Sequence, residues 1–151
     1  MDSLQERYAP AGCCFGCGVA NPDGLRIRSF PREGEVVCAW TGQVRYQAFP
    51  GVLNGGICGA LLDCHSNWTA IHHLIETRGL SAAPSMVTAD FHVKLRKPTP
   101  IGAIELRGRP VEINGDKVVV EASIEADGVV TATCRGTFVA VREGHPAYGR
   151  W

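Results

Sequence analysis

One long helical pattern constrains the fold of this 151-residue chain. Between residues 54 and 77, apolar side chains recur at spacings of three and four residues, which is typical of an α-helix. Asn54 is a suitable N-cap, and Arg78 followed by Gly79 is typical of a helix C-terminus. Three glycines in the first turns would each cost about 1 kcal/mol in an exposed helix. We therefore expect a buried helix whose backbone closely approaches a neighbouring element.

Strand patterns lie on both sides of this helix. Alternating apolar and polar residues predict strands at residues 25–30, 35–41, 85–96, 101–113, 117–126 and 129–141. Asn114-Gly115 and Asp127-Gly128 are hairpin signals between the last three of these strands. Two strands, a helix and four further strands predict an α+β fold, in which an antiparallel sheet packs against one long helix.

The remaining segments are predicted to be irregular. Residues 1–23 are rich in glycine, proline and cysteine and end in a turn sequence, so we expect an irregular lead-in. Residues 31–34 are expected to form a turn, and residues 42–53 show no clean period and predict a loop. The length of 151 residues favours a single domain over 1–151, with a core from about residue 24 to residue 141.

Charge and cysteine content limit the partners and the compartment. Fifteen basic residues balance fifteen acidic ones, so the chain has no overall positive field for a nucleic acid or an anionic membrane. The seven cysteines are an odd number spread through predicted strands and helix, which suits reduced thiols better than a disulfide framework. No apolar run reaches the length of a signal peptide or a membrane span. We therefore expect a soluble, cytoplasmic protein.

A second stripe on the predicted helix carries candidate chemistry. Gly56, Gly59, Asp63 and Asn67 follow one another at helical spacing, with little side-chain bulk and one carboxylate. Such a stripe would let an extended ligand approach a base or nucleophile, while free N–H groups at the helix start could stabilise an oxyanion. Alternatively, the glycines pack on a sheet and Asp63 points to solvent.

The spacing along the helix has a consequence for assembly. Nine residues separate Asn54 from Asp63, which corresponds to roughly 13 to 14 Å of helix rise. The two residues cannot meet at one carbonyl within one chain. If both act on the same substrate, the helix N-terminus of one subunit must face Asp63 of another, as in a two-fold dimer. This interpretation predicts a homodimer or a dimer of dimers.

Several of these segments also carry a family resemblance. Phe49-Pro50-Gly51-Val52-Leu53-Asn54-Gly55-Gly56-Ile57, followed by Leu61-Leu62-Asp63, is similar to the helix start of the hotdog-fold acyl-CoA thioesterases. Met86 to Phe91 and Lys94 to Pro98 resemble the downstream strand of the same superfamily, which includes the phenylacetate-pathway and 4-hydroxybenzoyl-CoA types. The resemblance implies an antiparallel sheet wrapped around one long central helix. It also implies hydrolysis of an acyl-CoA thioester.

The same resemblance implies roles for individual residues. Gly55 would donate its backbone N–H to the thioester oxygen, and Asp63 would act as nucleophile or as general base for water. Thr88 would orient the carboxylate or the water. Gly56 and Asn67 would contact substrate, and the basic run of Lys94, Arg96 and Lys97 would lie near the coenzyme A phosphates; a solvated strand end is the alternative for that run. No cofactor is implied, because coenzyme A is part of the substrate.

Asn54 departs from the pattern, since it stands where the family usually has the histidine of a His-Gly-Gly element. An amide can donate a hydrogen bond to a carbonyl, but it does not titrate near neutrality. A non-catalytic dimer that binds acyl-CoA is therefore an alternative function. A hotdog hydratase or dehydratase is a third, although no Asp/His or His/Glu pair is evident at the helix start.

Cysteines and histidines outside these motifs carry weaker signals. Cys14 and Cys17 form half of a zinc or redox motif without a second half at the usual spacing, which favours a structural or inert pair. Cys64 fits the buried helix as a small apolar residue. His65, His72 and His73 share the helix with Asp63 but are expected to lie outside the site. We therefore predict no metal site.

Overall fold

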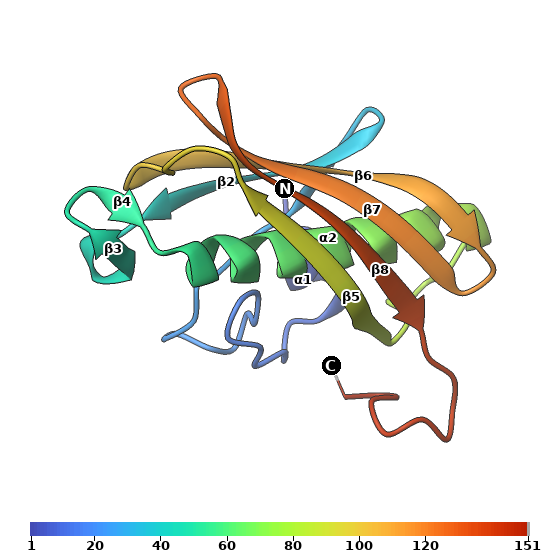
Figure 1. Ribbon diagram of the computed structural model, residues 1–151. Helices are drawn as coiled ribbons and strands as arrows, with labels where there is room; N and C mark the ends of the chain where they lie inside the picture. The colour runs from blue at the N-terminus through green and yellow to red at the C-terminus, as the bar shows by residue number, and fades with distance from the viewer. Residues whose placement is uncertain (151) are drawn as a thin grey trace.

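A long helix lies along one face of a curved antiparallel sheet in the computed structural model, which describes residues 1–150 (Figure 1). The helix is α2, Gly55–Arg78. The sheet has the strand order β1-β2-β6-β7-β8-β5. Its strands are β1 (Phe30–Arg32), β2 (Glu35–Gly42), β5 (Met86–Leu95), β6 (Gly102–Asn114), β7 (Lys117–Ala126) and β8 (Val129–Ala140). The α+β class and the antiparallel sheet wrapped around one helix are confirmed.

The ends of α2 follow from local sequence. Asn54 is the N-cap, and its side-chain Oδ1 accepts hydrogen bonds from the N–H groups of Gly56 and Ile57 at 2.8 and 3.2 Å. At the other end Gly79 adopts a left-handed conformation with a φ of 61°, which a glycine reaches without steric cost. The predicted helix is confirmed within one residue at each end.

The middle of α2 is enclosed on all sides. Residues 65–71 are buried without interruption, which covers nearly two full helical turns. The sheet covers one side of α2, while the lead-in segment passes along the other (Figure 1). On the sheet side, a Cβ added at Gly108 of β6 would lie 2.5 Å from Thr69 Oγ1, so only glycine permits this approach.

The hairpins at the end of the chain agree closely with the predicted strands. A two-residue loop at Gly115 and Asp116 joins β6 to β7, and its glycine has a φ of 59°. Asp127 and Gly128 join β7 to β8 with φ values of 50° and 76°, which matches the left-handed pair of a type I′ turn. These turns fix the register of the three central strands.

The predicted strand at residues 25–30 is wrong. Only its last residue belongs to a strand, because β1 covers Phe30–Arg32 and so also extends into the predicted turn. Arg26 has a φ of 57°, which interrupts any extended run. Leu25 and Ile27 are nevertheless buried, and the Leu25 carbonyl accepts a hydrogen bond from Trp40 Nε1 at 2.7 Å. The alternation of apolar and polar residues at 25–30 therefore reflects alternating burial in a loop and not a strand.

Two segments expected to be irregular contain short elements. The lead-in includes α1, Leu4–Tyr8, which starts with a capping box between Ser3 and Glu6. The expected loop at residues 42–53 contains a 3-10 turn and a small two-stranded sheet. These elements are η1 (Val44–Tyr46), β3 (Gln47–Phe49) and β4 (Val52–Leu53). Each is too short to produce a readable period in the sequence.

A buried hydrogen-bond chain ties the lead-in to α2 and the sheet. Gln5 Nε2 donates to Ser29 Oγ at 3.1 Å, and Ser29 Oγ lies 2.9 Å from His65 Nδ1. His65 Nε2 lies 3.0 Å from the Val36 carbonyl, which can only accept, so Nε2 carries the proton and Nδ1 accepts from Ser29. Burial lowers the pKa of His65 from 6.5 to about 4, because the charged form would be desolvated.

We predict that His65→Gln flattens the pH dependence of folding stability. The unfolded state binds the extra proton first, so stability present above pH 6.5 is lost as the pH falls toward the folded pKa of about 4. Chemical unfolding between pH 7 and pH 4 should show a wild-type loss larger than that of His65→Gln by about 3 kcal/mol. His92→Gln, at an exposed histidine, should match the wild type; equal slopes in all three proteins would contradict the assignment.

Candidate functional site

One side of α2 meets strand β5 in an antiparallel seam. A Cβ added at Gly55 would lie 2.9 Å from Leu95 Cδ1, and one added at Gly59 would lie 3.9 Å from Phe91 Cε2. Gly55 and Gly59 are therefore small where β5 side chains cover the helix. Gly59, a member of the predicted small-residue stripe, therefore faces the sheet, whereas a Cβ added at Gly56 of the same stripe would meet only Asn54 Oδ1, at 3.0 Å.

Asp63 continues this seam by one further turn of α2. It is half-buried, and its Oδ1 accepts a hydrogen bond from Thr88 Oγ1 at 2.7 Å. Desolvation raises the pKa of Asp63, the Thr88 hydrogen bond opposes that rise, and charge on Cys14 adds to it. Asp63 therefore does not simply point to solvent, and it is a stronger base than an exposed aspartate.

A β-bulge in β5 makes the Asp63–Thr88 contact possible. The pairing with β8 shifts between Thr88 and Asp90, which leaves Ala89 as an extra residue. Without the shift, Thr88 and Phe91 would project from opposite faces of the strand, because they are three positions apart. The bulge brings both residues to the face that covers α2.

The N-terminus of α2 keeps one backbone donor free. Asn54 Oδ1 takes the N–H groups of Gly56 and Ile57, and the Asn54 carbonyl takes that of Cys58. The N–H of Gly55 has no partner among residues 1–150. This is the donor that the family resemblance implies, and it lies at the positive end of the helix dipole.

A further polar group lies on α2 beyond Asp63. Asn67 is 7% exposed, and its Oδ1 has no hydrogen-bond partner within the described part of the chain. Buried polar atoms are almost always paired, so such atoms are candidates for contacts with a ligand or water. Asn67 lies one helical turn after Asp63, as the predicted stripe requires.

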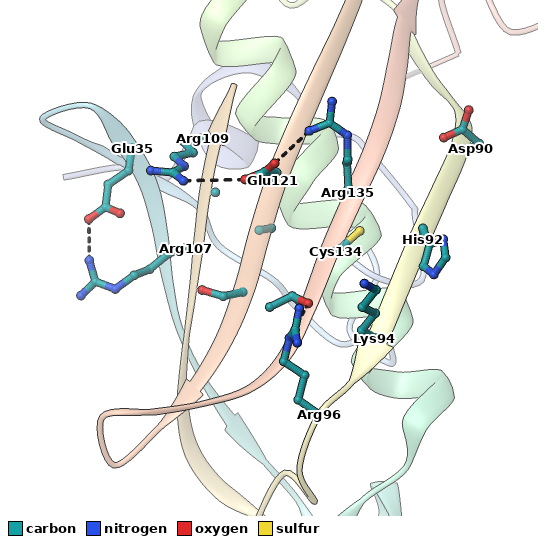
Figure 2. A pocket seen from close by; sticks show the side chains of 14 residues that line it. Glu35, Asp90, His92, Lys94, Arg96, Arg107, Arg109, Glu121, Cys134 and Arg135 are labelled. Carbon is teal, nitrogen blue, oxygen red and sulfur yellow. Dashed lines mark hydrogen bonds and ion pairs between the residues drawn. The ribbon is translucent and has the colours of Figure 1, made fainter. Parts of the chain in front are cut away.

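The residues of the basic run at the end of β5 lie in two different places: two of them line a groove, and the third follows the strand. Figure 2 shows Lys94 and Arg96 on the sheet face opposite α2, in a groove of about 750 Å³. Five arginines and lysines and three carboxylates line this groove. Lys94 and Arg96 form no ion pair among residues 1–150, and Arg96 Nε donates to Thr133 Oγ1 at 3.0 Å. Lys97 is exposed just after β5.

The other three arginines of the groove are held by carboxylates. Arg107 pairs with Glu35, and Arg135 donates to Glu121 at 2.8 Å. Arg109 lies 3.7 Å from the same Glu121 carboxylate. Lys94 and Arg96 are thus the groove cations without a neighbouring counter-ion among the described residues, which leaves them available to an anionic ligand.

The cysteine pair has a third member that the sequence spacing did not reveal. The Sγ atoms of Cys14, Cys17 and Cys64 all lie within 4.8 Å of one another. Cys64 belongs to α2 and was expected to be a plain apolar residue. Its position shows only in the folded chain, because the lead-in crosses α2 at this turn. His65, by contrast, has both ring nitrogens engaged, by Ser29 Oγ and by the Val36 carbonyl.

Comparison with known proteins places this architecture among thioesterase superfamily structures. A thioesterase superfamily protein from Shewanella loihica shares 27% identity and a TM-score of 0.65, over 82% of this chain and 97% of that one. A protein from Shewanella oneidensis related to the thioesterase superfamily shares 17% identity and a TM-score of 0.67, over 78% of this chain and 84% of that one. PaaI of the Escherichia coli phenylacetic acid degradation operon shares 16% identity and a TM-score of 0.65, over 78% of this chain and 81% of that one.

These neighbours confirm the resemblance to the hotdog thioesterase superfamily. No family model matches the chain, and no curated protein matches it. Of the helices in residues 1–150, none combines the length and apolar character that a membrane crossing needs. The class of protein is thus defined by fold, and the chemistry has to be argued from the residues.

We predict that Thr88→Val raises the pKa of Asp63 further, because the hydroxyl that stabilises the carboxylate is removed. Loss of this hydrogen bond should also lower the free energy of unfolding by about 1 kcal/mol. Carboxyl ¹³C NMR titration measures the first effect and chemical unfolding the second. Thr77→Val, at an exposed threonine of α2, the helix that carries Asp63, should leave the Asp63 titration unchanged. An unchanged Asp63 titration in Thr88→Val would contradict the contact.

Proposed function

We propose that this protein hydrolyses the thioester bond of an acyl-CoA, giving free coenzyme A and a carboxylic acid. The observation that carries the proposal is the half-buried Asp63 carboxylate held by Thr88 on the central helix. The likeness to thioesterase superfamily structures supports hydrolysis of a thioester in general. The coenzyme A portion rests on the basic residues described above.

The chemistry assigned to the site needs only a base and an oxyanion donor. Asp63 attacks the thioester carbonyl or removes a proton from the water that attacks it. The free N–H of Gly55, at the positive end of α2, stabilises the oxyanion that forms. The thiolate of coenzyme A then leaves without strong acid assistance, because thiols ionise at a pH near about 8.5. A neutral Asn54 is compatible with this sequence of steps.

Substrate contacts follow from the same seam. Leu95 covers Gly55, so the end of β5 lies at the N-terminus of α2. Lys94 and Arg96, the neighbours of Leu95 on β5, open onto the groove on the opposite face of the sheet, and Lys97 follows them. We assign the coenzyme A phosphates to this basic run at the end of the strand. Asn67 and the exposed Gly56 are assigned to contacts with the rest of the substrate. No cofactor takes part in this scheme.

A homodimer, alone or as a dimer of dimers, is part of the proposal. Gly55 and Asp63 lie roughly 12 Å apart along α2 and cannot reach one carbonyl together. Two features support a second copy at this face. Strand β5 is an edge of the sheet, and large apolar side chains are exposed on it, with Phe91 at 43% and Leu95 at 58%. Phe49, in the small sheet beside the start of α2, is 68% exposed (Figure 1).

One observation favours a second candidate function, an acyl-CoA-binding protein without turnover. Asn54 uses its side-chain oxygen to cap α2 and supplies no titratable group.

A panel of aromatic and aliphatic acyl-CoAs separates the two functions. Hydrolysis should be followed by loss of thioester absorbance, because seven protein cysteines would react with a thiol reagent. Tight binding without hydrolysis across the panel would select the binding function.

We predict that Asp63→Asn lowers kcat by at least about 100-fold while leaving acyl-CoA affinity and the melting temperature nearly unchanged. The amide can still accept the Thr88 hydrogen bond, so the local structure is kept. In the wild type, the acid limb of kcat should lie above the ordinary aspartate pKa, since burial raises the pKa of Asp63. Glu76→Gln, an exposed carboxylate of α2, is the control. Unchanged turnover in Asp63→Asn would remove the mechanism.

We predict that Gly55→Pro and Gly55→Ala differ in turnover although both add a Cβ at the same place. Proline removes the free N–H and is well tolerated at the first helical position, whereas alanine keeps the N–H. In both, the added Cβ meets only the flexible end of Leu95. Gly55→Pro should lose about 100-fold or more in kcat relative to Gly55→Ala, which is the scale of one oxyanion donor.

Mixing these defects tests whether the site is shared between chains. A doubly tagged heterodimer of Gly55→Pro and Asp63→Asn subunits contains one intact composite site, so it should show about half of wild-type turnover. If each site lay within one chain, the heterodimer would be as inactive as its parents. A monomer by light scattering that remains active would also contradict the shared site.

A further inference from the structure

We propose that Cys14, Cys17 and Cys64 bind a zinc ion, which fastens the lead-in segment to the central helix. The three sulfur atoms come from two separate parts of the chain and converge within 4.8 Å of one another. The proposal does not depend on the assigned thioesterase activity.

The sulfur geometry matches a metal site better than a disulfide. The Sγ atoms of Cys14 and Cys64 are 3.8 Å apart. In a tetrahedral site with zinc–sulfur bonds of about 2.3 Å, neighbouring sulfurs lie about 3.8 Å apart. A disulfide would require about 2.05 Å. The Cys14–Cys64 separation thus equals that of two zinc ligands, and Cys17 Sγ lies within 4.8 Å of both sulfurs.

The loop that carries Cys14 and Cys17 is shaped around the sulfurs. The N–H of Gly18 donates to the Cys14 carbonyl at 2.8 Å and closes the turn. A Cβ added at Gly16 would lie 2.3 Å from Cys64 Sγ, and one added at Gly18 would lie 2.5 Å from the backbone N of Cys14. Only glycine at these two positions lets the turn fold tightly and admits the helix cysteine.

Zinc binds the thiolate form of cysteine, so the hydrogen bonds around the cluster bear on metal binding. Within the cluster, hydrogen bonds from Cys17 and Cys64 lower the pKa of the Cys14 thiol, and the interaction with Cys14 raises the pKa of Cys17 and of Cys64. Trp68, one turn after Cys64 on α2, donates its indole N–H to Cys17 Sγ at 3.2 Å. Outer hydrogen bonds of this kind orient metal ligands and hold their charge.

The donor set selects the ion. Three thiolates are soft ligands that suit zinc and disfavour magnesium or calcium. Cys13 is exposed and lies outside the cluster, so we assign the fourth position to a water molecule. Neutralising the clustered thiolate charge in a half-buried place would stabilise the junction of lead-in and helix.

Metal titration of the reduced full-length protein tests the proposal. Zinc affinity should be measured by competition with a chromophoric chelator, and cobalt should be used as a spectroscopic probe. We expect about one metal ion per chain, with thiolate-to-cobalt charge-transfer bands, and a rise in melting temperature on adding zinc.

Single variants show which sulfurs are responsible. Cys14→Ser, at a half-buried position that tolerates a hydroxyl, should weaken zinc binding by about 100-fold and reduce the charge-transfer intensity. Cys38→Ala, at a buried cysteine outside the cluster, should bind as the wild type does. No stoichiometric uptake, equal cobalt spectra in both variants, or a Cys14–Cys64 disulfide in mass spectra of the protein purified without oxidant would each overturn the proposal.

Discussion

The enclosure of α2 is the constraint on which the rest of the structure depends. Residues 65–71 are buried without interruption, so this part of the helix turns no face to water. Each polar side chain there requires a partner, and His65 obtains two from Ser29 and Val36. Asp63 lies just before the buried run and is only half-buried. It therefore combines a raised pKa with access to a substrate, which a carboxylate two residues further along α2 could not do.

The N-cap shows how a folding requirement shapes the proposed chemistry. Four N–H groups at the start of α2 have no partner within the helix, and Asn54 Oδ1 accepts from two of them, those of Gly56 and Ile57. The N–H of Asn54 itself donates to the Tyr46 carbonyl. Only Gly55 is left with a donor that a substrate could use. With an asparagine cap, a single N–H at the positive end of the helix is therefore available to a ligand. The acid–base work then falls on Asp63, because an amide does not titrate.

The sequence predicts the long-range architecture well where local signals are strong. The caps at Asn54 and Gly79 and the two late hairpins are such signals, since each depends on a few neighbouring residues. The strand predicted at residues 25–30 fails because burial alternates there while Arg26 adopts a left-handed backbone. Helical spacing alone singles out Asp63 as a candidate base, whereas the role of Thr88 comes from a family resemblance, and their contact depends on a bulge that no local pattern reveals.

The lead-in segment contributes more to the candidate site than its irregular sequence indicates. It covers the side of α2 that the sheet leaves open, and the Gln5–Ser29–His65 chain anchors it to the helix. Cys14 of the same segment acts electrostatically on Asp63, adding to the rise that burial causes in the pKa of that carboxyl. Thr88, from the sheet side, opposes it. The Thr88 hydrogen bond acts on this pKa more strongly than the Cys14 charge does, so the basicity of Asp63 depends first on burial and on β5, and only then on the lead-in.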